Sequence, residues 1–307
     1  MTQATLAARR PRVARNEWAV MLRKFVRGII PTTIGLLIFI VLAFPIAWLV
    51  DTSFKDAYAS RAIPPQYIPL QPTLQVYQAF FAGEAGAATT RELQYWYVMV
   101  ANSLFVALVP AFLATIIGTL AGYGFARFAF PGGMLLLTIL LLGQMFPGPS
   151  LFVPIYFVVT ALGLHDNLWA LVLVYTAFHV PVATWLMCGF IRTIPIELEE
   201  AARIDGASLL QVLLQIVLPL ARIGILTVAL LGFMAFWGEY GFASIIVETQ
   251  SKYTATIGLV RQMTTMGVSF NVIGAAATMM AAPMLVFLML MQKQFVRGLT
   301  AGALKDA

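Results

Sequence analysis

PIELEEAARIDGASLLQVLLQIVLP, residues 195–219, is a polar island in a very apolar chain. Long hydrophobic runs flank it on both sides, and its charged side chains lie in its first half: Glu197, Glu199, Glu200, Arg203 and Asp205. Acids in the first turn of a helix interact favourably with the positive end of the helix dipole. The stretch therefore predicts a short surface helix between two apolar segments.

The ends of this helix are marked by residues with special backbone preferences. Pro195 suits the first helical position, where its missing N–H would have no partner, and Gly206 can take the left-handed conformation that ends a helix. The predicted helix has about 11 residues, and Glu199 and Arg203 are spaced to pair on its surface. Ser208 then caps a second helix, which carries the chain back into apolar sequence.

The composition is that of a protein that crosses a membrane several times. Of the 307 residues, 61% are hydrophobic and 10% are charged, whereas a soluble domain carries about 25% charged residues. The net charge of +6 does not indicate nucleic acid, because the basic residues lie between apolar spans and not along one helix face. Cys188 lies in an apolar run, so we expect no disulfide framework and no cysteine metal site.

Apolar runs divide the chain into six predicted transmembrane helices. The first, residues 29–50, carries no charge and would measure about 33 Å as a helix, enough to cross the hydrocarbon core. The others cover approximately residues 96–125, 134–160, 168–191, 214–237 and 272–291. We therefore expect an all-α membrane protein with a transmembrane domain over residues 29–292.

Extramembrane segments separate and flank these spans. Residues 1–28 form a basic arm, in which we expect a solvated tail up to residue 15 and an amphipathic interfacial helix over 16–28. Residues 51–95 are polar and rich in proline, and residues 238–271 form a second long loop. The last segment, residues 293–307, is a tail.

Basic residues set the orientation of the chain. With the N-terminus inside, 14 of the 19 Lys and Arg residues lie in the arm, at residue 127, in the polar island with its flanks (Arg192, Arg203 and Arg222), and in the tail. Cytoplasmic segments carry such an excess of basic residues. Both termini are therefore predicted to lie in the cytoplasm. The polar island, which connects spans 4 and 5, is predicted to lie there too.

Two features inside the predicted spans bear on packing and on a permeation path. Ala114, Gly118 and Gly122 recur at four-residue spacing, which allows a neighbouring helix to approach closely. Gln144 is a polar residue inside the third span and precedes Pro147-Gly148-Pro149, which should break the helix. Broken helices often line permeation paths, so Gln144 is a candidate for the path; packing against another helix is the alternative.

The polar island also resembles a known motif. Glu200-Ala201-Ala202, Asp205-Gly206-Ala207, Ile216 and Leu218-Pro219 are similar to the EAA loop of the membrane subunits of bacterial ABC importers. In that family the helix of this loop docks into a cleft on an ATPase subunit. One departure is Arg222, because the family often has proline at this position.

Further segments resemble the sugar-importer branch, in particular the second membrane subunit of the maltose type. They are Asn102-Ser103, GYGFARFAFPG (residues 122–132), Met145-Phe146-Pro147, Gly189-Phe190 and FVRGLTAGALK (residues 295–305). Two positions depart from the family. Trp237-Gly238 stands where the family often has Trp-Asn, and Val76 stands where it often has Asn.

The resemblance implies a set of partners and contacts. The partners are a second related permease subunit, two ATPase subunits and an extracytoplasmic sugar-binding protein, which the loop over residues 238–271 would contact, all at a bacterial inner membrane. It implies docking of the ATPase on Glu200, Ala201, Ala202, Asp205 and Gly206. It also implies contact between the ATPases and the tail at Gly298, Leu299, Thr300, Ala301 and Gly302. The cargo would be a disaccharide or oligosaccharide, with a glycerol-phosphate type of cargo as the alternative.

The sequence lacks the motifs of a nucleotide site or a catalytic centre. None of the five lysines follows a glycine, as a phosphate-binding loop requires, so ATP and magnesium would bind to partner subunits. His165 and His179 lack acidic partners at metal-ligand spacing; we expect an external turn residue and a packing residue. A stand-alone ion-coupled carrier is the alternative function, and a membrane enzyme is a third. Besides Gln144, candidates for the substrate path at the outer end of span 5 are Trp237, Glu239 and Tyr240, for which an interfacial location is the simpler interpretation.

Overall fold

The computed structural model describes residues 17–82, 95–264 and 269–303, and these ranges are helical and contain no strand. The chain divides into two compact units, residues 1–50 and 51–307. The first unit holds most of helix α1 (Glu17–Ser53), which from Gly28 onward is long and apolar enough to cross a membrane. Residues 17–28, predicted as an interfacial helix, are the first turns of this same helix. The predicted solvated tail, residues 1–15, lies outside the described residues.

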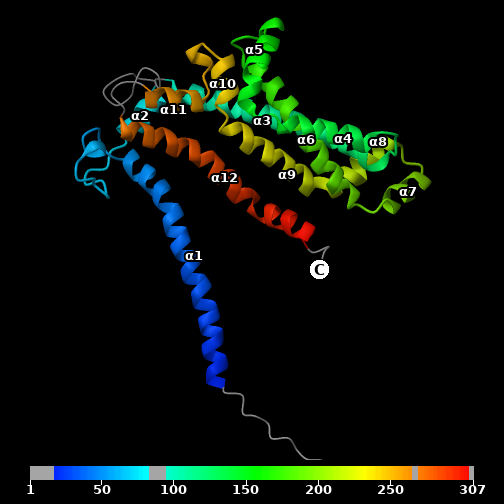
Figure 1. Cartoon of the computed structure of the whole chain (residues 1–307), viewed down its shortest axis with the longest axis horizontal. Coiled ribbons are helices and arrows are strands. Elements are labelled where there is room, and N and C mark those ends of the chain that lie inside the picture. Colours follow the sequence, from blue (N-terminus) through cyan, green and yellow to red (C-terminus); the bar gives the residue numbers. More distant parts are fainter. Residues whose placement is uncertain (1–16, 83–94, 265–268, 304–307) are drawn as a thin grey trace, which may run out of the picture. The chain divides into compact units, whose positions relative to one another are not determined.

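The second unit is built from long helices joined by short ones (Figure 1). A 3₁₀ turn, η1 (Ala59–Arg61), and helix α2 (Gln75–Ala82) lie in the segment predicted to be extramembrane. The long helices are α3 (Trp96–Arg127), α6 (Leu168–Arg192), α9 (Leu218–Trp237) and α12 (Phe270–Ala303). These helices and α1 account for five segments, within the described ranges, that could cross a membrane.

The predicted third span is broken, as its proline-glycine-proline sequence indicates. Its first half is α4 (Gly133–Leu142) with the 3₁₀ turn η3 (Gly143–Met145), and its second half is η4 (Gly148–Leu151) with α5 (Phe152–Ala161). The two halves meet at 97°, on either side of Pro147. Proline ends a helix here because its ring and missing N–H interrupt the hydrogen-bond ladder. The number of spans is six if this bent pair is counted as one.

Helices α3, α6 and α9 form the centre of the unit. The most extensive contact between helices is that of α3 with α6, and α9 packs against both. Gly118 and Gly122 lie in the α3–α6 contact: a Cβ added at Gly118 would lie 2.5 Å from the Cβ of Ala183, and one at Gly122 would lie 2.8 Å from the backbone nitrogen of Cys188. The predicted close approach at these small residues is confirmed, and it brings the two backbones nearly into contact.

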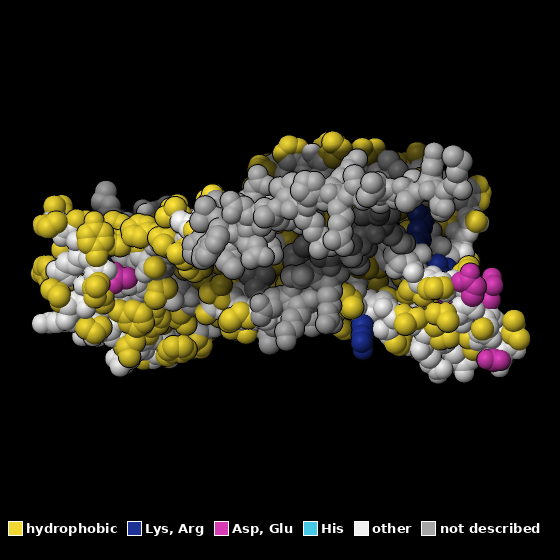
Figure 2. Space-filling view, turned by 90° about the horizontal axis from the view of Figure 1, so that it is seen from below, with side chains coloured by type: hydrophobic (Ala, Val, Ile, Leu, Met, Phe, Trp, Pro, Cys, Tyr) yellow, Lys and Arg dark blue, Asp and Glu magenta, His cyan; other side chains and the backbone are white. Residues whose placement is uncertain are grey.

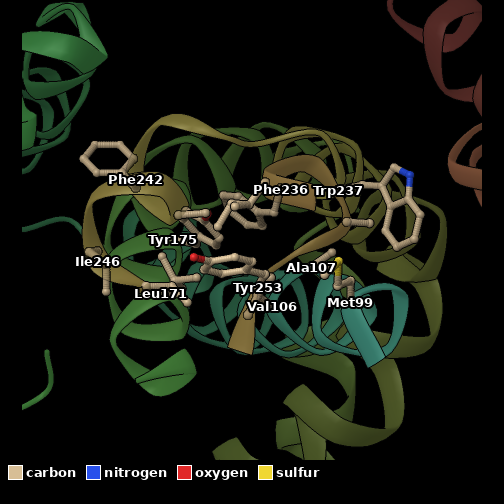
Figure 3. Close-up of a cluster of buried hydrophobic side chains, with 14 of the residues drawn as sticks. Met99, Val106, Ala107, Leu171, Tyr175, Phe236, Trp237, Phe242, Ile246 and Tyr253 are labelled. Carbon is tan, nitrogen blue, oxygen red and sulfur yellow. The ribbon is translucent and has the colours of Figure 1, made fainter. Parts of the chain in front are cut away.

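The larger of two hydrophobic clusters joins the central helices to two short ones (Figure 3). Tyr175 of α6 stacks on Phe236 of α9, with ring centroids 4.8 Å apart. Helices α10 (Gly241–Ile246) and α11 (Ala255–Thr264) bury apolar side chains in this cluster, among them Ile246 and Ile257. Residues 238–271 were predicted as a loop, but their apolar residues make part of this segment helical and fold it onto the bundle.

We predict that the α3–α6 contact tolerates no added methyl group at Gly118. Gly118→Ala should lower the stability of the detergent-solubilised protein by about 1–3 kcal/mol, because the new Cβ forces the helices apart. Thermal unfolding followed by tryptophan fluorescence measures the change. Gly124→Ala on the same helix is the matched control, since a Cβ there would meet nothing within 4 Å. Equal melting temperatures for the two variants would contradict the prediction.

Candidate functional site

The polar island contains a short helix, α7 (Glu197–Ile204), with three acids in its first turn and Arg203 in its last turn. The carbonyl of Ile196 accepts from the N–H groups of Glu199 and Glu200, at 2.9 and 3.0 Å, so the helix begins just after Ile196. The predicted start at Pro195 is wrong, and the helix has 8 residues instead of about 11. Residues 193–194 belong to the turn that closes α6, where the N–H groups of Thr193 and Ile194 donate back to carbonyls of that helix.

The C-terminal end of α7 depends on Gly206. Gly206 has φ +90°, a left-handed conformation that side chains disfavour. This turn lets the N–H of Ala207 donate to the carbonyl of Ala202 at 2.9 Å, the long-range bond that closes a helix C-terminus. The prediction for Gly206 is confirmed.

A second helix starts at once. Ser208 caps α8 (Leu209–Val212): its Oγ accepts from the N–H of Gln211 at 3.4 Å, while the Gln211 side chain accepts from the N–H of Ser208 at 2.7 Å. This reciprocal pair confirms the predicted cap. One π-helical turn, η5 (Leu213–Val217), then leads into α9.

One side of α7 is open. Glu200, Ala201 and Asp205 are exposed, and so are two large apolar side chains, Ile204 at 86% and Leu198 at 46%. Figure 2 shows acidic side chains beside hydrophobic ones at the end of the view where α7 lies. The open side of α7 therefore combines negative charge with apolar surface.

Ala202 does not belong to this open side. The helical period places Leu198, Ala201, Ala202 and Asp205 on one side of a helix, but Ala202 packs with Ala207 against the second hydrophobic cluster. That cluster contains Tyr123, Ala183, Met187, Ile191, Ile194, Val212, Leu213, Val217, Ala221 and Val228. Ala202 seats α7 on the bundle because its small side chain lets the helix come close.

The inner side of α7 also carries a buried charge. Glu199 was expected to pair with Arg203 on the surface; instead its side chain is 1% exposed and its Oε1 accepts from the Nε of Arg127 at 2.6 Å. Its Oε2 accepts from the hydroxyl of Tyr123 at 2.9 Å. The correction has a simple cause: Glu199 lies three residues before Ala202 and therefore shares the side of α7 that packs on the bundle, whereas Glu197 and Glu200 are exposed. Sequence reasoning missed Tyr123 and Arg127, although both lie in the GYGFARFAFPG segment.

The other predicted ATPase contacts lie in the tail. Gly298, Leu299, Thr300, Ala301 and Gly302 belong to α12, whose backbone continues to Ala303. Their side chains lie outside the described part of the structure, so their role stays a prediction.

Three of the four residues predicted for the substrate path are held by side-chain hydrogen bonds of their own. Gln144 is exposed, and its Nε2 donates to the carbonyl of Phe178 at 2.8 Å, which ties η3 to α6. The indole Nε1 of Trp237 donates to the carbonyl of Met280 at 2.9 Å. The carboxylate of Glu239 accepts from the Tyr175 hydroxyl and from the first N–H groups of α10, while Tyr240 is 40% exposed. A role in the path stays a prediction for all four.

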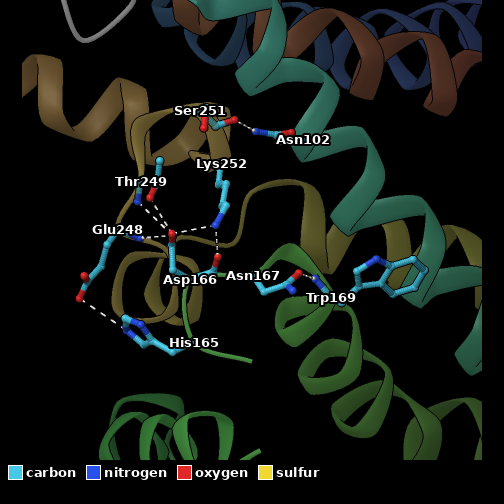
Figure 4. Close-up of polar contacts among 9 residues, drawn as sticks. All are labelled: Asn102, His165, Asp166, Asn167, Trp169, Glu248, Thr249, Ser251 and Lys252. Atoms are coloured by element: carbon cyan, nitrogen blue, oxygen red, sulfur yellow. Dashed lines mark hydrogen bonds and ion pairs between the residues drawn. The ribbon is translucent and has the colours of Figure 1, made fainter. Parts of the chain in front are cut away.

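Asp166, between α5 and α6, accepts several hydrogen bonds from residues far away in the sequence (Figure 4). Its carboxylate accepts from the N–H groups of Glu248 and Thr249, from the Thr249 hydroxyl, and from Lys252 Nζ at 2.8 Å. Asn102 holds the same segment from α3, because its Nδ2 donates to the carbonyls of Ser251 and Tyr253. These contacts fix residues 248–253, which include the 3₁₀ turn η6 (Gln250–Lys252), to α3 and to the α5–α6 connection.

These contacts also set the charge of Asp166. Burial raises the pKa of its carboxyl, but Lys252 and the hydrogen bonds from Thr249 and Glu248 outweigh burial and hold that pKa well below its usual range. Sequence reasoning missed this network. The polar run His165-Asp166-Asn167 between two apolar spans was its signal, but its partners lie more than 80 residues away.

The histidines behave as structural residues. The Nε2 of buried His179 lies 3.1 Å from the carbonyl of Val228, which confirms the predicted packing role. His165 lies 3.5 Å from Glu248 at the surface turn where it was expected. Across the described ranges, no group of three or more His, Cys, Asp or Glu side chains is arranged to hold a metal ion.

The chain is similar to a known protein family. Residues 114–301, more than half of the chain, match the family model described as "Binding-protein-dependent transport system inner membrane component". The chain is 33% identical to the galactooligosaccharides transport system permease protein GanQ of Bacillus subtilis over 92% of this chain and 97% of GanQ. It is 31% identical to the trehalose transport system permease protein SugB of Mycobacterium tuberculosis, over 85% of this chain and 92% of SugB.

The fold also matches a solved structure. A chain of a bacterial ABC transporter involved in the import of the acidic polysaccharide alginate superposes with a TM-score of 0.73 at 20% identity, covering 92% of this chain and 99% of the other. At this identity the likeness concerns the fold.

We predict that the stability contributed by the Asp166 carboxylate decreases in acid. Because its pKa is lower in the folded than in the unfolded protein, the carboxylate contributes stability above its ordinary pKa of about 3.9 and loses it as the pH falls further. Asp166→Asn should therefore melt below the native protein at pH 7, and the gap should narrow between about pH 5 and pH 3. Melting temperatures of both proteins in detergent across this range test the idea; a constant gap would contradict it.

Proposed function

Because the chain belongs to the family of binding-protein-dependent transport system inner membrane components, we propose that it is the membrane-spanning permease subunit of an ATP-driven sugar importer. Two relatives that it matches over most of their length are named for sugar transport. In this proposal the chain forms half of the translocation path and pairs with a second, related permease subunit. The family description also favours this function over a stand-alone ion-coupled carrier, since it names dependence on a binding protein.

The observation that carries the coupling to ATP is the open side of α7. Ile204 and Leu198 are exposed beside Glu200 and Asp205, whereas Glu199 and Ala202 on the inner side of the helix pack on the bundle. Two large apolar side chains grouped with acidic ones on one side of a helix suit a protein interface, which combines an apolar centre with a polar rim. We assign this side to an ATPase subunit, with Glu200, Ala201, Asp205 and Gly206 in or beside the contact.

The mechanism is mechanical. When ATP draws two ATPase subunits together, α7 moves with the subunit to which it is docked, and the helix bundle changes between inward-open and outward-open arrangements. The second proposed contact with the ATPases is the tail at residues 298–302. ATP and magnesium bind to the ATPase subunits, and both termini of this chain lie in the cytoplasm.

A disaccharide or an oligosaccharide is the proposed cargo. The names of the relatives cover galactooligosaccharides and trehalose, so the family transports more than one kind of glycoside. An extracytoplasmic sugar-binding protein delivers the cargo. Gln144, Trp237, Glu239 and Tyr240 remain the candidates for contact with it.

We predict that a charge at Ile204 separates the permease from its ATPase. Ile204→Asp should reduce the amount of ATPase that copurifies with the tagged complex at least tenfold, because a carboxylate would be desolvated in the contact; Ile204→Leu is the matched control and should copurify as the native chain does. The readouts are the subunit ratio on a gel and uptake of labelled trehalose or galactooligosaccharide by cells. Native copurification with Ile204→Asp would refute the proposed contact.

The turn at Gly206 provides a second test. Gly206→Ala should reduce uptake several-fold without loss of the protein from the membrane, since a Cβ is strained at φ +90° and would displace the end of α7. Gly189→Ala is the control, because that glycine has no neighbour within 4 Å of an added Cβ and no left-handed conformation. Equal uptake by the two variants would speak against a precise placement of α7.

A further inference from the structure

A single buried acid connects the proposed docking helix to the membrane helices. Glu197 and Glu200 of α7 are exposed, but the side chain of Glu199, between them, is 1% exposed and that of its partner Arg127 is 7% exposed. A carboxylate is buried at such a place only when its charge and its lone pairs are matched.

The contacts join three parts of the chain through one guanidinium. Arg127, the last residue of α3, donates from Nε to Glu199 at 2.6 Å and from Nη2 to the carbonyl of Ile194, in the α6–α7 connection, at 2.8 Å. Tyr123, one turn earlier on α3, donates to the other oxygen of Glu199 at 2.9 Å. Both carboxylate oxygens of Glu199 are thus bound by the same face of α3.

We propose that Arg127 and Glu199 form the joint through which displacement of α7 reaches α3, a positioning role that rests on the function proposed above. The covalent links of α7 are short turns: residues 193–196 on one side and the left-handed turn at Gly206 on the other. A push on α7 could be taken up by rotation about these turns. The ion pair prevents this, because it ties α7 to a helix to which it is not adjacent in sequence.

The packing of α3 allows it to transmit a displacement of α7 to the other helices. It packs closely along α6 and also against α9, so a displacement at its end is passed to the centre of the bundle. The far part of α3 carries Asn102, which holds residues 251–253 near Asp166. One helix therefore runs from the joint to the outer polar network.

A purely structural ion pair and a joint differ in one testable respect. Two apolar residues can replace a buried ion pair without loss of stability, whereas they cannot replace its directional hydrogen bonds. The variant that separates the two roles is Arg127→Leu combined with Glu199→Leu, in the complete complex with its ATPase subunits.

The experiment reports movement beside the Asp166 network, at the end of the bundle far from α7, and needs no knowledge of the sugar. A fluorophore is attached at Glu248→Cys, which is accessible, while the native Cys188 is buried. The labelled chain without further substitutions is the parent. Trapping the reconstituted complex with ATP, magnesium and vanadate should change the fluorescence of this parent. In the double leucine variant the complex should assemble and hydrolyse ATP, but the change should fall at least fivefold. Arg222→Leu, which removes an exposed arginine, is the matched control and should respond as the parent does.

The outcomes separate the joint from the function on which it rests. A full response in the double leucine variant with bound ATPase would overturn the joint and leave the proposed function standing. Failure of the parent chain to assemble with an ATPase would overturn both, and no response in an assembled parent complex would overturn the joint alone. If the double leucine variant does not assemble, Arg127→Lys takes its place: its ammonium cannot span both acceptors as the guanidinium does, so the response should fall about threefold while assembly persists, and a full response would overturn the joint.

Discussion

A buried charge in an apolar protein has to be matched by a partner, and this constraint decides how the polar island meets the membrane helices. Glu199 is enclosed by α3, by the α6–α7 connection and by α7 itself, so its carboxylate is stable only with Arg127 and Tyr123 in place. The same guanidinium satisfies the carbonyl of Ile194. The end of α3, the α6–α7 connection and α7 are thus positioned together by one set of hydrogen bonds.

Close packing extends this constraint into the bundle. Gly118 and Gly122 allow α3 and α6 to approach until the backbone of one meets side chains and backbone of the other. A contact of this kind leaves little room for one helix to slide along the other, because packed interiors do not deform continuously. α3 and α6 therefore behave as one element, to which α7 is attached at the cytoplasmic end proposed here and the Asp166 network at the other.

The two polar sites use the same chemistry in different surroundings. At Asp166 most of the hydrogen bonds to the carboxylate come from residues 248–252, a segment far away in the sequence, and they hold a connection in place. At Glu199 both donors come from one rigid helix, and they hold a short helix in place. Each site fastens a segment that has few apolar contacts of its own, so hydrogen bonds supply what hydrophobic packing does not.

Local chemistry was readable from the sequence alone. The apolar runs indicated the long helices, Pro147 the break in the third span, Gly206 and Ser208 the ends of two helices, and the EAA-like residues the family. Each of these signals depends on residues that are neighbours in the chain. The inward turn of Glu199, the seat of Ala202 on the bundle, the helices in residues 238–271 and the partners of Asp166 depend on which segments meet in space, 72 to 86 residues apart in the case of the two polar sites. The sequence does not show whether a carboxylate faces water or a buried arginine. The packing of the helices decides which of the two environments Glu199 has.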